Sequence, residues 1–186
     1  MRKNFGAKAI LYPMPVLIIG TYDENGTPNA MNAAWGGISE ETEISICVDD
    51  SHKTAENVVK AGAFTVSIAD KNNVVAADYV GIVSGNNQED KIAKCGWTAE
   101  KSDLVNAPLF KELPLTLECK LKSYDTDTCR LTGEIVNVSA DESILGDDGK
   151  ISLDKFFPIT YDPVGHTYRT LGEVVGKAFS DGKQLK

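Results

Sequence analysis

The feature that most constrains the fold is a series of short apolar runs joined by tight turns. Residues 16–22 are rich in Val, Ile and Leu, and residues 27–34 follow after a turn that contains Asn25 and Gly26. An Asn-Gly pair suits the positive φ angles of a tight hairpin turn, and apolar runs of this length are typical of buried strands. The sequence therefore predicts a β-hairpin, whose strands run antiparallel, near its start.

Further along the chain, apolar and polar residues alternate in several short segments. Additional strands are predicted over residues 43–48, 64–68, 115–124 and 129–139. One helix, residues 53–61, is predicted between two of these strands, with Ser51 as a candidate N-cap and Gly62 as the stop signal. Strand hairpins with a single helix between them favour a mainly β barrel, with an α+β fold as the alternative.

The remaining segments predict peripheral structure around that sheet. Helices are expected over residues 73–83, 89–95, 153–157 and 171–179. Residues 97–110 are expected to form an extended connection that either covers the barrel or reaches another subunit. A doubly wound parallel fold is disfavoured, because no G-x-G-x-x-G follows the first strand. The length of 186 residues fits one domain spanning residues 1–186.

Charge and hydropathy exclude several classes of function. The net charge is −8, which argues against a nucleic-acid-binding protein because such proteins need a basic surface. The apolar stretch over residues 9–20 is interrupted by Pro13 and Pro15 and ends in a hairpin turn, so it is interpreted neither as a signal peptide nor as a membrane span.

The four cysteines show no C-x-x-C spacing, which disfavours a zinc ribbon or a thioredoxin motif. In a chain of this length they are interpreted as reduced thiols, and a cytoplasmic location is expected. His52 and His166 lack neighbouring ligands at metal-binding spacing, so no metal site is predicted.

Two stretches could bind a ligand. Residues 26–37 combine small side chains with amides and Trp35. A flat ring could therefore lie against the backbone, and its nitrogen and oxygen atoms could accept hydrogen bonds from the backbone N–H groups. The alternative is a tightly packed strand with a glycine bend. Residues 51–54, Ser-His-Lys-Thr, stand at the expected start of a helix, where free N–H groups and the helix dipole attract an anion such as phosphate. Here the alternative is an ordinary helix cap.

The ordered set of motifs resembles the flavin reductase-like family, which includes the flavoredoxins. The resemblance covers residues 15–179, and no single motif is diagnostic. It rests on Gly26-x-x-Asn29-Ala30-Met31, Trp35, Ser51-His52-Lys53-Thr54-Ala55-Glu56-Asn57, Gly62-x-Phe64-Thr65-Val66, Asp90-Lys91, Tyr161, and Tyr168-Arg169-Thr170-Leu171-Gly172-Glu173.

This resemblance implies a six-stranded antiparallel split β-barrel with peripheral helices, a homodimer, and noncovalent FMN near the subunit interface. Position by position, it assigns Asn29, Ala30, Met31 and Asn32 to the isoalloxazine, with Cys47 and Val48 beside it. It assigns Ser51, His52, Lys53 and Thr54 to the ribityl phosphate. Asp90 and Lys91 would complete the pocket, from the same or the other subunit.

Some residues depart from the family's pattern. Asn32 stands where threonine is common, and His52-Lys53 stands where arginine is often found. Asp49-Asp50 precedes the expected phosphate site and would weaken it unless both carboxylates point away.

Three functions remain open at this point. The first is an oxidoreductase that oxidises NADH or NADPH and passes electrons through FMN to free flavin, iron or a redox protein. The second is a flavoredoxin-like electron carrier that is reduced by another enzyme. The third is a barrel that binds another planar ligand or serves as a dimeric scaffold. The first two need no catalytic acid–base pair, because the cofactor supplies the chemistry.

Overall fold

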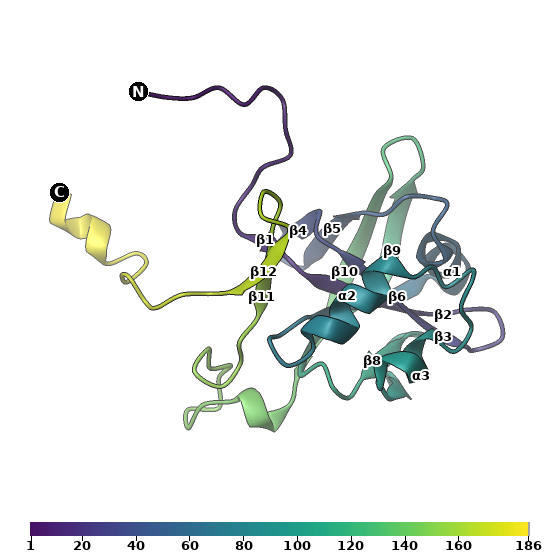
Figure 1. Cartoon of the computed structure of the whole chain (residues 1–186). Helices are drawn as coiled ribbons and strands as arrows, with labels where there is room; N and C mark the ends of the chain where they lie inside the picture. Colours follow the sequence, from purple (N-terminus) through teal and green to yellow (C-terminus); the bar gives the residue numbers. More distant parts are fainter. Residues whose placement is uncertain (186) are drawn as a thin grey trace.

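The body of the protein is a curled antiparallel sheet that forms a half-open barrel (Figure 1). The computed structural model describes residues 1–185. The sheet consists of β2 (Leu17–Tyr22), β3 (Pro28–Ala33), β4 (Gly36–Glu40), β5 (Glu43–Cys47), β6 (Ala63–Ile68), β9 (Leu115–Asp125) and β10 (Arg130–Ala140). Their order is β3-β2-β6-β9-β10-β5-β4, and every neighbouring pair is antiparallel. The predicted split-barrel fold is confirmed.

The main sheet has seven strands, whereas the resemblance implied six, and β4 is a strand that the sequence pattern did not predict. Gly36 lies in this strand, which packs closely on its neighbours. A Cβ at this position would lie 3.0 Å from Cγ1 of Ile46 and 3.1 Å from Cδ1 of Leu17. Glycine therefore allows β4 to lie close to the core at this position, where a larger side chain would clash.

Helix α1 (Lys53–Ala61) begins and ends where the sequence predicts. Gly62 takes a φ of 66° and its N–H bonds to the carbonyl of Val58, as a left-handed C-cap does. The predicted N-cap is wrong. His52 is the N-cap, and the Ser51 hydroxyl donates to Asp49 instead, at 2.6 Å.

The middle of the chain forms two further helices and a hairpin. They are α2 (Val74–Ile82), α3 (Lys91–Cys95), β7 (Ala99–Lys101) and β8 (Pro108–Phe110). Oγ1 of Thr65 in β6 donates to the carbonyl of Pro108 at 2.6 Å. The connection over residues 97–110 therefore covers the barrel of its own chain.

A small second sheet brings the two ends of the described chain together (Figure 1). It has the order β1 (Met14–Pro15), β11 (Ile159–Asp162) and β12 (Thr167–Thr170), all antiparallel. None of these strands was predicted, because each is too short to show a clear alternation. Within residues 1–185, no helix is long and apolar enough to cross a membrane.

Two predicted helices are wrong. Residues 153–157 form one hydrogen-bonded turn, in which the carbonyl of Ser152 accepts from Lys155 and Phe156. Residues 171–177 have no regular secondary structure and residues 178–180 form a turn; the only helical pieces late in the described chain are the 3₁₀ turns η1 (Glu142–Ile144) and η2 (Asp181–Leu185). Glycines and adjacent β-branched valines disfavour a helix at 171–179, and no core packs there to compensate.

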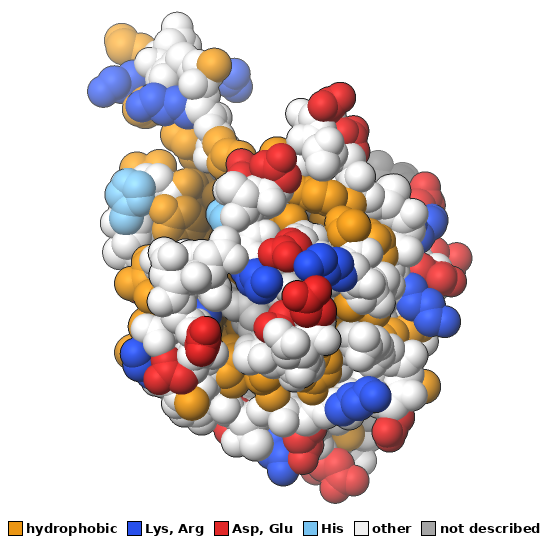
Figure 2. Space-filling model, turned by 90° about the vertical axis from the view of Figure 1, so that its right-hand side faces the viewer, with side chains coloured by type: hydrophobic (Ala, Val, Ile, Leu, Met, Phe, Trp, Pro, Cys, Tyr) orange, Lys and Arg blue, Asp and Glu red, His pale blue; other side chains and the backbone are white. Residues whose placement is uncertain are grey.

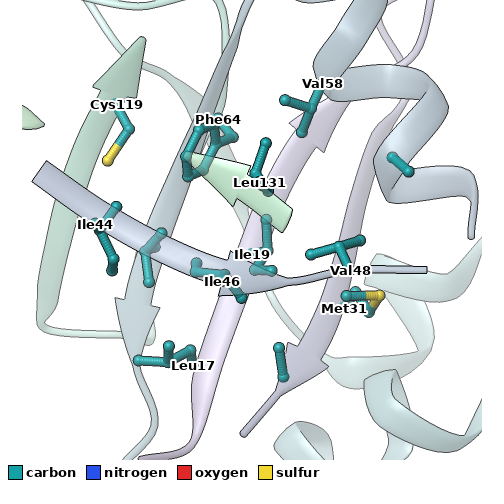
Figure 3. Close-up of a cluster of buried hydrophobic side chains, with 13 residues drawn as sticks. Leu17, Ile19, Met31, Ile44, Ile46, Val48, Val58, Phe64, Cys119 and Leu131 are labelled. Atoms are coloured by element: carbon teal, nitrogen blue, oxygen red, sulfur yellow. The ribbon is translucent and has the colours of Figure 1, made fainter. Parts of the chain in front are cut away.

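The main core fills the inside of the curled sheet (Figure 3). Its most buried members come from six strands and from α1; among them are Leu17, Ile19, Ile44, Ile46, Val58, Phe64, Val66, Cys119 and Leu131. A second cluster lies on the opposite face of β2, where Val16 and Ile18 pack with Val80, Trp97 and Phe110. Since both faces of β2 are covered, its continuous apolar run has a direct structural cause.

The packing around Phe64 gives the first prediction. A Cβ on Gly133 would lie 2.3 Å from Cζ of Phe64, which is fully buried. Gly133→Ala should therefore lower the free energy of unfolding by about 1–3 kcal/mol, measured by urea denaturation. Gly37→Ala is the matched control, since its added Cβ meets nothing within 4 Å. Equal stability of the two variants would contradict this packing.

Candidate functional site

A cavity of about 210 Å³ lies where β3, the start of α1 and the segment after α2 meet. Most of the residues predicted to bind a flavin nucleotide line it. The full lining is Asn29, Met31, Asn32, His52, Lys53, Thr54, Val80, Gly81, Ile82, Val83, Ser84, Gly85 and Lys91. Segments distant in the sequence thus form one hollow, and Lys91 reaches it within the same chain.

The first turn of α1 opens into this cavity. Its N-cap, His52, has a side chain that makes no capping hydrogen bond in the described part of the chain. The N–H groups of a first helical turn have no partners inside the helix, and the helix dipole adds positive potential. Lys53 and Thr54 contribute an ammonium and a hydroxyl at the same place, although the ammonium also pairs with Glu56 at 3.1 Å. This end of the cavity suits an anion.

Asn29 is the polar side chain that joins β3 to this helix. Its Nδ2 donates to Oγ1 of Thr54 at 3.1 Å, and the residue is 7% exposed. Its Oδ1 is buried and has no hydrogen-bond partner among residues 1–185. A buried acceptor without a partner is costly unless a ligand or water supplies a donor.

Gly85 keeps the space beside Asn29 open. A Cβ at position 85 would lie 2.5 Å from Oδ1 of Asn29 and 3.5 Å from Cβ of Lys53. Any side chain there would therefore displace Asn29 or fill the hollow between β3 and α1. The absence of a side chain at this position is needed for the cavity.

Lys91 places a cation at the other side of the cavity. Its Nζ donates to the carbonyls of Ala30 at 2.7 Å and Val80 at 3.0 Å, and the residue is 2% exposed. Burial lowers the pKa of Lys91 to about 8. An ammonium has three N–H donors, so one remains for a ligand in the cavity.

Two more hollows share walls with this cavity. One of about 270 Å³ shares Asn29, Lys53 and Gly85, and one of about 370 Å³ shares Asn32, Gly81 and Ile82. Ligand pockets usually measure roughly 300–1,000 Å³, so a nucleotide would extend from the first cavity into a neighbour.

Aromatic side chains of the small sheet line the larger neighbouring hollow. The rings of Tyr161 and Tyr168 lie with centroids 6.0 Å apart, and Tyr161 Oη lies 2.9 Å from Nδ1 of His166. The hydroxyl of Tyr168 donates to Asp78 at 2.8 Å, and burial together with this bond raises the pKa of Tyr168 to about 12. Tyr168 thus stays protonated and ties β12 to α2.

Several residues assigned by the resemblance lie away from the cavity. Ala30 contributes only its carbonyl, and the side chain of Val48 is in the main core. Cys47 is exposed in a separate hollow with Trp35. Ser51 bonds to Asp49, and its hydroxyl and amide lower the pKa of that carboxyl.

Asp90 is the remaining residue outside the lining. It is exposed and pairs with Lys94 at 3.5 Å, one turn further along α3. The resemblance assigned Asp90 and Lys91 together to the pocket, but in the structure only Lys91 lines it. The buried cation lines the cavity, whereas the carboxylate faces solvent.

Residues 81–85 line the cavity but were not among the predicted site residues. Gly81 lies in the helix predicted over residues 73–83, and Ser84 and Gly85 lie between that helix and the one predicted over residues 89–95. The signal that could have found them is the second glycine, because glycine in a polar loop after a helix often marks close approach of backbone to a ligand.

Comparison with known proteins places this geometry in a family. Residues 9–166 match the family model described as "Flavin reductase like domain". The chain belongs to the flavin reductase-like family. It is 39% identical to a flavoredoxin of Desulfovibrio vulgaris (Miyazaki F), with a TM-score of 0.93 over 98% of this chain and 100% of the other.

Two further solved structures support the family's fold. A flavoredoxin from Methanosarcina acetivorans is 28% identical, with a TM-score of 0.86 over 100% of this chain and 98% of the other. An FMN-binding domain of a flavin reductase-like enzyme from Shewanella baltica OS155 is 19% identical, with a TM-score of 0.79 over 88% of each chain. At 19% identity, the second similarity supports the fold alone.

The buried cation gives a testable pH dependence. The pKa of Lys91 is lowered from 10.5 to about 8 in the folded protein, so the unfolded chain binds more protons between these values. Raising the pH through this window therefore stabilises the fold through Lys91, by on the order of 2–3 kcal/mol. Urea denaturation of the flavin-free protein measures this effect. As the pH rises through the window, the free energy of unfolding of wild type should increase by this amount relative to that of Lys91→Met.

The control for that experiment is Lys94→Met, because Lys94 lies on the same helix but is half exposed. Its difference from wild type should stay constant over the same pH range. A pH-independent difference for Lys91→Met would mean that Lys91 keeps its ordinary pKa.

Proposed function

We propose that this protein binds FMN noncovalently in the cavity and acts as an NAD(P)H-dependent flavin reductase. The observation that carries the proposal is the donor set around one hollow: an uncapped helix start, the unpartnered Oδ1 of Asn29 and the buried ammonium of Lys91. The first suits the phosphate, the second needs a hydrogen-bond donor from a ligand, and the third suits a ring that gains negative charge.

The residues of this chain would divide the nucleotide between them. The start of α1, with Lys53 and Thr54, would hold the phosphate. The β3 residues Asn29, Met31 and Asn32, together with Lys91, would line the isoalloxazine. FMN would supply hydride and electron transfer, while the protein would fix its position, with Lys53 near the phosphate and Lys91 near the ring.

A flavoredoxin-like electron carrier is the second candidate. The two neighbours of 39% and 28% identity are both named flavoredoxins, which favours this candidate. Under it, the same cavity holds FMN but a separate enzyme reduces the flavin. The two candidates differ in one property, which is direct oxidation of the nicotinamide.

We also propose a homodimer in the cytoplasm, with residues 1–186 as one domain and either free flavin or a redox protein as electron acceptor. The four free cysteines agree with a reducing compartment. The neighbouring hollow of about 370 Å³ is lined by Tyr161 and Tyr168 of the small sheet, where a second subunit could cover a bound flavin.

Anaerobic mixing separates the two candidates. The purified FMN-loaded protein should lose its flavin absorbance within seconds when NADH or NADPH is added, because hydride transfer bleaches the oxidised ring. Stopped-flow absorbance with each nicotinamide measures the rate. Bleaching only after addition of a separate flavin-reducing enzyme would instead identify the carrier.

The phosphate assignment gives a second test. Lys53→Ala and Thr54→Ala should each weaken FMN binding more than riboflavin binding, since riboflavin has no phosphate. Each lost charge-assisted hydrogen bond should cost about 1.5–3 kcal/mol, measured by fluorescence titration of the flavin-free protein.

Lys60→Ala is the matched control, because Lys60 lies on the last turn of α1 and pairs with the same Glu56 as Lys53. Its affinities for both flavins should equal those of wild type. Equal losses for FMN and riboflavin in the Lys53 and Thr54 variants would place the phosphate elsewhere.

A further inference from the structure

Both ends of the chain leave the small sheet as arms that project from the barrel. The N-terminal arm is residues 1–13, before β1, and the C-terminal arm is residues 171–185, after β12. Figure 1 shows the purple and the yellow end extending away from the barrel on the same side. Every residue of both arms is exposed.

The arms carry large apolar side chains that are exposed to solvent in the described chain. In the C-terminal arm, Val174, Val175 and Phe179 are 90%, 94% and 99% exposed. The N-terminal arm adds Met1, Phe5, Ile10, Leu11 and Tyr12, all exposed. Several large apolar side chains exposed close together in the sequence indicate an interaction site.

The polar contacts of the C-terminal arm stay within it. Lys177 donates its N–H to Asp181 at 2.8 Å, and its carbonyl accepts from Ser180 and Asp181. The N-terminal arm is tied to the small sheet near its end, where the hydroxyl of Tyr12 donates to Asp162 at 2.6 Å. The arms are therefore fixed at their base and project beyond it.

Charge distinguishes the N-terminal arm from the rest of the molecule. It contains Arg2, Lys3 and Lys8, and all 27 acidic residues of the chain lie after it. In Figure 2, the arm that projects at the upper left shows basic and hydrophobic side chains, while acidic side chains are scattered over the body. A basic apolar arm complements the acidic body of another copy.

We infer that the two arms bind to the body of a second copy of this chain, and that the arms of the second copy bind to the body of the first. The inference rests on the homodimer proposed above and names the segments that hold it together. A two-fold pair repeats every contact, so each copy gives two arms and receives two. Stable interfaces use roughly 20–30 residues from each partner, which the arms supply between them.

The test uses the full chain with Val174→Asp, Val175→Asp and Phe179→Asp combined. These side chains are solvent-exposed in the single chain, so the subunit should keep its fold, checked by circular dichroism and thermal melting. Sedimentation velocity should show a wild-type dimer and a dissociation constant raised at least about tenfold in the variant. Leu104→Asp, at an exposed apolar residue outside the arms, is the control and should match wild type.

Cross-linking of mixed light and ¹⁵N-labelled protein locates the arms directly. Links from Lys177 or Lys183 to residues 14–170 should join light to heavy chains. Links confined to single chains would overturn the inference by showing that the arm folds back on its own body.

Two other results separate this inference from the proposals it rests on. Equal dissociation constants for the wild-type and variant dimers would contradict the exchange of arms but not the homodimer. A monomeric wild type would contradict both. FMN titration of each sample decides flavin binding separately, because no arm residue lines the cavity.

Discussion

The ammonium group of Lys91 joins the elements that form the cavity. It bonds at once to β3 through Ala30 and to α2 through Val80, and it is itself part of α3. Both partners are neutral carbonyls, so its positive charge is solvated but not cancelled. A second link joins the same two elements, because Nδ2 of Asn32 in β3 donates to the carbonyl of Ala77 in α2 at 3.0 Å. Lys91 adds the attachment of α3 to this pair, and so closes one wall of the cavity.

A cation held by carbonyls has a second effect in a chain of net charge −8. Desolvation disfavours the charged form, and an anionic ligand nearby would reverse that penalty. The helix start of α1 acts in the same direction at the opposite wall. Positive potential is thus concentrated locally, while the acidic remainder of the surface limits nonspecific binding of anions.

Sequence reasoning succeeded where a local rule decides the structure. The Asn25-Gly26 turn, the Gly62 C-cap and the alternating strands follow from rules that act over a few residues. The cavity walls at Lys53, Thr54 and Lys91 were assigned through the family resemblance, and the structure places them around one hollow.

The failures share a different cause, because tertiary contacts outweigh local pattern there. Gly36 suggests a bend from the local sequence, whereas its close contacts with Ile46 and Leu17 show why a strand needs glycine there. The segment over 171–179 has helical spacing of apolar residues but no surface in its own chain to pack on. The glycine at position 85 is a local signal for a close approach, but its partner, Asn29, is remote in the sequence and is identified only by the structure.

The pairing of β1 with β11 also sets an order of assembly. Met14 lies opposite Tyr161, so a strand made at the start of synthesis waits for a partner made near its end. The barrel strands are complete once β10 has left the ribosome, whereas the aromatic wall of Tyr161 and Tyr168 is added last. The hollow of about 370 Å³ that these tyrosines line is therefore completed only after the barrel, whereas the cavity of about 210 Å³ is lined by residues 29–91 and needs neither strand.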